Sequence, residues 1–176
     1  MATLSVDDFK AKLIGGGARA NLFKVIINNP PVGAGLNTEL LSFTCKGAVL
    51  PGSVVEAIDV PFRGRVLKVA GDRTFENWTI TAYNEDKQDV RNSFERWMNI
   101  INDVKENSGE KNPRNYQADL IVQQLDRQGK TTKEYDIRGA FPVNISAIDL
   151  AYDTNNAIEE FTVEFAFQYW QTKVAN

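Results

Sequence analysis

Two groups of acidic side chains are the first candidates for chemistry in this sequence. Glu56 and Asp59 lie close together, and a pair of carboxylates can serve as general acid and base in glycoside hydrolysis. The surrounding segment is rich in valine and shows no sign of a pocket. Because carboxylates in such a setting are usually solvated, the sequence favours a surface position for both.

Asp149, Asp153 and Glu159 form the second group and could be considered as calcium ligands. Their order does not follow an EF-hand loop, so the sequence favours a solvated turn. The chain also contains three tryptophans, Trp78, Trp97 and Trp170. Their rings could form a platform for a sugar, but each lies on an apolar stripe, which is more typical of a core residue.

The composition argues against several other kinds of site. The chain has no histidine, so Ser–His–Asp and Cys–His nucleophile sites cannot be assembled. Cys45 is the only cysteine, which excludes an intrachain disulfide and a multi-cysteine zinc cluster, and indicates synthesis in a reducing compartment. No glycine-rich phosphate loop of the P-loop or dinucleotide type is present. We therefore expect no catalytic residue, no metal and no cofactor.

Size and charge indicate one packed domain over residues 1–176. The hydrophobic content is 43% and the formal net charge is -3. This acidic balance argues against a surface that grips nucleic acid. We expect no membrane segment, and the beginning of the chain lacks the layout of a signal peptide.

The stretch 69–84 organises the rest of the chain. Gly71-Asp72 predicts a turn, residues 74–83 predict a strand, and Asn84 is placed to cap a helix over residues 86–101. That helix has an apolar face and should pack behind a sheet. The residues expected in the core are Phe75, Trp78, Phe94, Trp97, Phe161, Val163 and Phe165.

The N-terminal part of the chain predicts an arm and an exposed loop. Ser5 and Asp8 match a helix capping box, with Leu4 and Phe9 as a hydrophobic staple. A glycine hinge at residues 15–17 ends that helix, so residues 1–20 form an N-terminal arm. Residues 28–38 are rich in turn residues and should form an exposed loop. We expect both segments to become ordered when neighbouring subunits stack.

Period-two patterns predict the remaining strands. They cover residues 22–27, 41–49, 54–60, 65–70, 116–125, 131–138, a segment from Pro142 to Tyr152, and 161–169. Residues 103–114 should form a surface loop. The fold class is therefore mainly β, an antiparallel β-sandwich or barrel with one main packed α-helix and a short N-terminal helix. So many short strands must hide their edges, for example by pairing with identical subunits around a ring.

Several motifs together resemble one family. The stretch Val69-Ala70-Gly71-Asp72-Arg73-Thr74-Phe75-x-x-Trp78-x-x-Thr81, followed by an acidic helix start, is similar to the tail tube proteins of T4-like contractile-tailed bacteriophages. The family's further motifs occur in order as Asn21-Leu22-Phe23, Cys45-Lys46 with Leu50-Pro51, Gly139-Ala140-Phe141-Pro142, Asp153-Thr154-Asn155-Asn156 and Tyr169-Trp170. The resemblance extends from about residue 7 to 170. The sequence departs from it in the loop at 28–38 and after Trp170.

The resemblance implies a structural virion protein and no enzyme. Hexameric rings would close into a β-barrel and stack into the rigid inner tube of the tail, which conducts DNA into the host during contraction. The implied partners are other copies of the chain, the sheath protein, and the baseplate and tail terminator proteins. DNA would pass through the lumen without specific binding. The resemblance places the protein in the virion tail, assembled in the host cytoplasm.

Two sets of residues follow as candidates for assembly and for the channel. The candidate ring-stacking residues are Leu4, Phe9, Pro30, Pro31, Leu36, Phe62 and Arg63. The candidate lumen-facing carboxylates are Glu56, Asp59, Asp149 and Glu164, which would repel DNA phosphates. Two alternatives stay open: a tube protein of a type VI-like or other contractile injection system, and, more distantly, a monomeric carbohydrate-binding β-sandwich.

Overall fold

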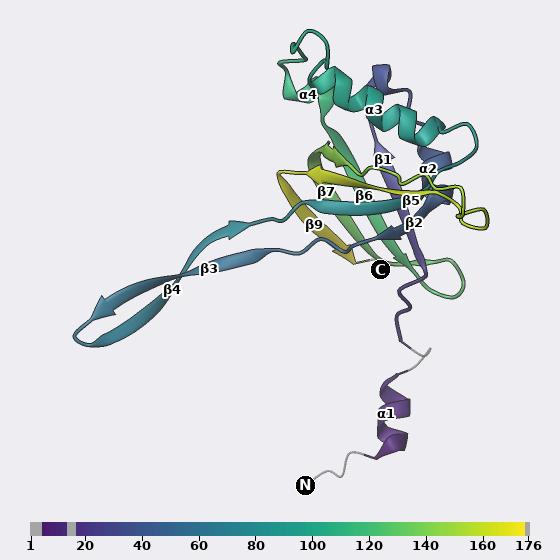
Figure 1. The fold of residues 1–176 in the computed structure, drawn as a ribbon. Helices are drawn as coiled ribbons and strands as arrows, with labels where there is room; N and C mark the ends of the chain where they lie inside the picture. The colour runs from purple at the N-terminus through teal and green to yellow at the C-terminus, as the bar shows by residue number, and fades with distance from the viewer. Residues whose placement is uncertain (1–4, 14–16, 175–176) are drawn as a thin grey trace.

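The computed structural model describes residues 5–13 and 17–174, and it has the expected mainly β, antiparallel architecture (Figure 1). One seven-stranded sheet has the order β1-β6-β7-β8-β5-β2, with β9 also paired to β7. Its strands are β1 (Phe23–Asn28), β2 (Cys45–Ala48), β5 (Trp78–Tyr83), β6 (Ala118–Leu125), β7 (Thr131–Ile145), β8 (Glu160–Ala166) and β9 (Tyr169–Val174). A separate two-stranded sheet is formed by β3 (Val54–Phe62) and β4 (Arg65–Thr74).

Strand β7 divides the large sheet into two halves that enclose the core. Its first part pairs with β9 from Lys133 to Arg138, and its last part pairs with β8 from Phe141 to Ile145. Gly139 lies between the two parts with φ 63, a conformation that glycine adopts at little cost. This single long strand therefore connects both halves of the body.

The core is apolar, with an aromatic cluster where the main helix meets β5 and β8. Phe165 packs against Trp78, Phe94 and Trp97, with ring centroids 5.7, 5.8 and 6.2 Å away. Six of the seven expected core residues are buried: Trp78, Phe94, Trp97, Phe161, Val163 and Phe165. Phe75 is half-buried.

The main helix, α3 (Asp89–Ile101), closes one end of the core (Figure 1). It starts three residues later than the sequence predicts, and Asn84 does not cap it. Its N-cap is Gln88 at φ 55, and the Glu85 side chain accepts a hydrogen bond from the Val90 N–H at 2.8 Å. Asn84 instead donates through Nδ2 to Glu159 at 2.8 Å.

The predicted strand at 41–49 is wrong in its first half. Residues there form the helix α2 (Thr38–Thr44), capped by Asn37, whose Oδ1 accepts the Leu40 N–H at 3.0 Å. Only β2 at the end of the segment is extended. A helix fits this sequence because it buries Leu41 and turns Glu39 and Phe43 outward.

The loop at 28–38 is less exposed than the sequence predicts. It contains a 3₁₀ turn, η2 (Val32–Ala34), and both Ala34 in this turn and Pro31 before it are buried. The Arg96 Nε–H donates to the Ala34 carbonyl at 2.9 Å, and the Ser93 hydroxyl donates to the Gly35 carbonyl at 3.3 Å. This loop is therefore fastened to α3 by hydrogen bonds.

The C-terminal third differs from the predictions in two places. The expected strand from Pro142 ends at Ile145, and residues 146–159 form an exposed loop in which Leu150 and Tyr152 point into solvent. The expected last strand is divided into β8 and β9 at residues 167–168. The loop expected at 103–114 ends in a short helix, α4 (Pro113–Tyr116), capped by Asn112.

The N-terminal helix α1 (Val6–Lys12) lies apart from the body (Figure 1). The Ser5–Asp8 capping box is confirmed, and none of the helical residues is buried. The staple partner Leu4 and two of the hinge glycines lie outside the described residues. No helix in the described ranges is long and apolar enough to cross a membrane.

Candidate functional site

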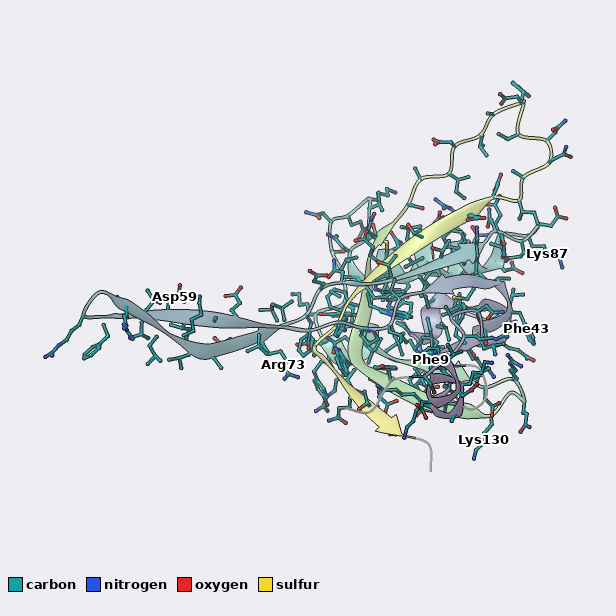
Figure 2. The ribbon with its side chains drawn as sticks, turned by 90° about the horizontal axis from the view of Figure 1, so that it is seen from below. Phe9, Phe43, Asp59, Arg73, Lys87 and Lys130 are labelled. Carbon is teal, nitrogen blue, oxygen red and sulfur yellow. The ribbon has the colours of Figure 1, made fainter. Side chains whose placement is uncertain are left out.

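The hairpin of β3 and β4, residues 54–74, is the outstanding surface feature of the molecule. It projects from the body as a two-stranded ribbon, with side chains extending into solvent on both sides (Figures 1 and 2). Within residues 5–13 and 17–174, its strands pair only with each other. Gly71 is half-buried and the other residues of β3 and β4 are exposed.

Local chemistry explains why the chain forms this ribbon. The tip carries consecutive positive φ values, 44 at Arg63 and 81 at Gly64, as a tight two-residue hairpin turn requires. Gly71-Asp72 does not form the predicted turn, because it lies inside β4 as a bulge opposite Glu56. A Cβ at Gly71 would lie 3.0 Å from the Glu56 carbonyl oxygen, so the bulge favours glycine.

The two faces of the hairpin differ in chemistry. Directly paired residues share a face, so the register Ile58↔Val69, Val60↔Leu67 and Phe62↔Arg65 defines an apolar face. Its apolar side chains are exposed as follows: Ile58 54%, Val60 42%, Phe62 67%, Leu67 62% and Val69 44%. The opposite face carries the Pro61↔Val66 pair and, beside it, the ion pair of Lys68 Nζ with Asp59 Oδ1 at 2.8 Å.

A two-stranded ribbon with this composition is unusual as an exposed element of a single subunit. Two-stranded hairpins are marginally stable in water, and proteins rarely expose a continuous apolar strip without using it for contact. We therefore take the apolar face of the hairpin as the candidate assembly surface. Sequence reasoning included Phe62 and Arg63 among the candidates but missed Ile58, Val60, Leu67 and Val69. Their alternation correctly predicted strands. It did not indicate that these apolar side chains would stay exposed in a single subunit.

A second feature of the molecule is a cluster of charged side chains on the outer side of β6, β7 and β9. Arg138 contacts Asp119 at 2.6 Å and Asp136 at 2.9 Å, and Lys173 contacts Asp136 at 2.7 Å. The Asp136 side chain is only 2% exposed. Burial raises the pKa of this carboxyl group, but the Lys173 hydrogen bond and the Arg138 charge lower it more, so the net pKa lies below its ordinary value. The cluster joins the last strand to the body.

The structure does not bring the four lumen candidates together. Glu56 and Asp59 lie on the hairpin, Asp149 lies in the exposed loop 146–159, and Glu164 lies on β8. Glu164 accepts a hydrogen bond from Asn144 Nδ2 at 3.4 Å. Glu56 and Asp59 are solvent-exposed, as expected for surface carboxylates.

The stacking candidates are also spread over the molecule. Phe62 and Arg63 form the hairpin tip, and Phe9 is exposed on α1. Pro30 and Leu36 are half-buried and Pro31 is buried, so Pro31 is not available as a surface contact. Leu4 lies outside the described residues.

The remaining chemical candidates do not form sites. Within residues 5–13 and 17–174, no cluster of three or more acidic, cysteine or histidine side chains could hold a metal ion. Trp78 and Trp97 are buried, which removes them from a sugar platform. Burial raises the pKa of the Cys45 thiol to about 11, which makes it a poor nucleophile. A groove of about 1010 Å³ lies between α3 and the end of β7.

Comparison with known proteins agrees with this architecture. Residues 18–173 match a family profile described as phage tail tube protein. The chain is 41% identical over 169 residues to tail tube protein gp19 of Enterobacteria phage T4, covering 94% of this chain and 99% of that protein. It is 30% identical over 172 residues to the tail tube protein of Serratia phage KSP90, covering 95% of each.

Solved structures share this fold at low sequence identity. A chain of the anti-feeding prophage tube-terminating cap superimposes with a TM-score of 0.67 at 15% identity, covering 90% of this chain and 92% of that one. A chain of the sheath–tube complex of an extracellular contractile injection system, in its extended state, gives 0.60 at 12% identity, covering 98% and 100%. Identity this low shows the fold alone. The family profile and the phage relatives extend over almost the whole sequence, and the chain belongs to the phage tail tube protein family.

Proposed function

We propose that this chain forms six-membered rings that stack into the hollow inner tube of a contractile phage tail. The observation that carries the proposal is the exposed apolar face of the hairpin, which runs along a ribbon that projects from the body. Covering it with a second copy removes apolar surface from water and pairs free strand edges. Family membership supports a tube as the product.

In this tube the chain has a structural, non-catalytic role, and viral DNA passes through the lumen during ejection. Sheath, baseplate and terminator proteins are the proposed partners outside and at the ends of the tube. Solved structures of the same fold come from a sheath–tube complex, a baseplate and a tube-terminating cap, which supports this set of partners. The identity to phage proteins favours a phage tail over another injection system.

The assembly proposal is tested by the size and shape of the purified full chain. We expect sedimentation to show a species much larger than one subunit at high protein concentration, and electron microscopy to show rings and tubes. A compact monomer at all concentrations would contradict the proposal. Replacement of Leu67 by Asp, in the apolar face of the hairpin, should prevent assembly, whereas Asp59→Asn on the opposite face should have a much smaller effect.

We further propose that carboxylates line the channel. Of the four candidates, Glu164 has the best position, because it points outward from a regular strand of the body. A wall of carboxylates offers no counter-charge to phosphates, so DNA does not adhere. Glu164→Lys should leave tube assembly intact and slow DNA ejection, whereas Glu106→Lys in the loop after α3 should not. Equal ejection from both variants would contradict this assignment.

A further inference from the structure

The direction of the hairpin depends on a short stretch of chain where it joins the body. We call residues 49–53 and 75–77 the hairpin base, because they connect β2 to β3 and β4 to β5. Neither segment belongs to a strand. A nine-residue strand such as β3 extends about 30 Å, so a rotation of ~10° at the base moves the tip by roughly 5 Å. Assembly through the hairpin therefore needs a fixed base.

Both segments of the base contact the same short piece of chain, which runs from Phe167 after β8 to Trp170 at the start of β9. On the first segment, the Trp170 indole N–H donates to the Gly52 carbonyl at 3.0 Å. On the second segment, the Phe75 ring packs against Phe167 with centroids 5.6 Å apart. A third contact, from the Trp78 indole N–H to the Val49 carbonyl, holds the start of the first segment.

The outer part of the first segment is open on one side. Among the described residues, nothing lies within 4 Å of a Cβ built on Gly52. The hydrogen bond to Trp170 is a contact that limits movement of the chain there. The preceding residue, Pro51, is buried, which fixes the chain only up to that point.

Trp170 is itself held firmly by the body. It pairs with Ile137 across β7 and β9, and its ring packs on Tyr135 with centroids 5.7 Å apart at an interplanar angle of 62°. The strand that carries it is anchored further along by Lys173, which contacts the buried Asp136 at 2.7 Å. The donor therefore lies on a rigid support.

We infer that Trp170 is a positioning residue for assembly, which sets the direction of the hairpin through its bond to Gly52. This inference rests on the proposed function, because the hairpin must make the contacts between copies for its direction to affect assembly. The inference gives strand β9 the role of supporting the hairpin. The position of β9 in the large sheet does not by itself indicate this role.

Trp170→Phe separates this role from general stability. The variant keeps an aromatic ring against Tyr135 but removes the indole N–H. The matched control is Tyr169→Phe, which removes one polar group from the neighbouring exposed aromatic residue of the same strand. Spin labels on cysteines introduced at Arg63 and Lys130, in a Cys45→Ala background, report the distance from the hairpin tip to the body in single subunits.

We expect Trp170→Phe to broaden this distance distribution and to raise the protein concentration needed for tube formation by roughly three- to tenfold, the range expected for one lost hydrogen bond. Tyr169→Phe should match the parent in both measurements. An unchanged distance distribution in Trp170→Phe would overturn the inference. Because the distances are measured in single subunits, this result is independent of whether the parent chain forms tubes, which tests the proposed function separately.

Discussion

The body and the hairpin contain strands of similar composition, but the apolar side chains of these strands differ greatly in how far they are buried. On β5, Trp78, Ile80 and Ala82 alternate toward the core and are almost completely buried. On β3, Ile58 and Val60 alternate in the same way and remain about half exposed. The alternation specifies a strand in both cases. Whether its apolar face is covered depends on a partner, and for the hairpin that partner is absent from a single copy.

Because of this difference, the stability of one subunit and the assembly of several subunits should depend on different residues. Burial of apolar side chains in the body stabilises the fold of one subunit. The apolar side chains on the hairpin are buried, and contribute favourable free energy, only when another copy covers them. Each half-exposed side chain of the apolar face should contribute on the order of 1 kcal/mol once buried. Substitutions in the two regions should therefore affect different measurements.

The largest effect is expected from removal of the hairpin. Val54 and Thr74 are paired, so residues 55–73 can be replaced by a two-residue Asn-Gly turn without separating the ends. We expect complete loss of tube formation with a folded body, measured by sedimentation and by circular dichroism. Tubes formed by this variant would show that assembly uses another surface.

A substitution in the core should have the next largest effect, on stability. Trp97→Ala should reduce the free energy of unfolding by about 3–5 kcal/mol, because it leaves a cavity beside Phe94 and Phe165. It also leaves the Tyr116 carbonyl without the indole donor at 2.7 Å. Urea unfolding of the single subunit measures the change. A loss below about 1 kcal/mol would show that this helix face is not part of the core.

The corresponding substitution on the hairpin should leave stability almost unchanged. Phe62→Ala removes a side chain that is 67% exposed, so the free energy of unfolding should change by less than about 0.5 kcal/mol. The concentration needed for tube formation should nevertheless rise several-fold. Phe43→Ala on α2 is the matched control, since this phenylalanine is also exposed but lies off the hairpin. Equal weakening of assembly in both variants would contradict a special role for the hairpin.

The smallest expected effect concerns pH and the body alone. The pKa of Asp136 is lower in the folded chain than its ordinary value, so the unfolded chain binds more protons in this range. The stabilisation from this carboxylate is therefore present above the ordinary carboxyl pKa and is lost as the pH falls toward the folded value. Unfolding at a series of pH values between 6 and about 3 should show this decline. In Asp136→Asn the decline should be weaker, and equal slopes in parent and variant would contradict the assignment.

The sequence predicted the body better than its connections. Period two on β5 and β8 identified the strands and the buried residues Trp78, Phe161 and Val163, because alternation indicates that one face of a strand is covered. The segment around Leu40 and Leu41 fits a strand as well as a helix, and only the packed structure selects the helix. The cap of α3 was missed because Glu85 reaches the backbone from outside the usual capping position.

The candidate site was predictable only in part. A hairpin ending near Arg63-Gly64 follows from turn chemistry, but its projection from the body depends on the base contacts of Trp170 and Phe167, which are more than 90 residues away in sequence. Gly71-Asp72 predicts a turn by residue type, yet forms a bulge because the strand pairing continues on both sides of it. Local sequence does not contain either long-range constraint.

Amide hydrogen exchange across the hairpin tests the central claim most directly. The measurement compares residues 54–74 in single subunits with the same residues in assembled tubes, using the core strand β5 as the internal reference. We predict rapid exchange of the hairpin amides in single subunits and strong protection in tubes, while β5 is protected in both. Hairpin amides that exchange at the same rate in subunits and in tubes would contradict the account.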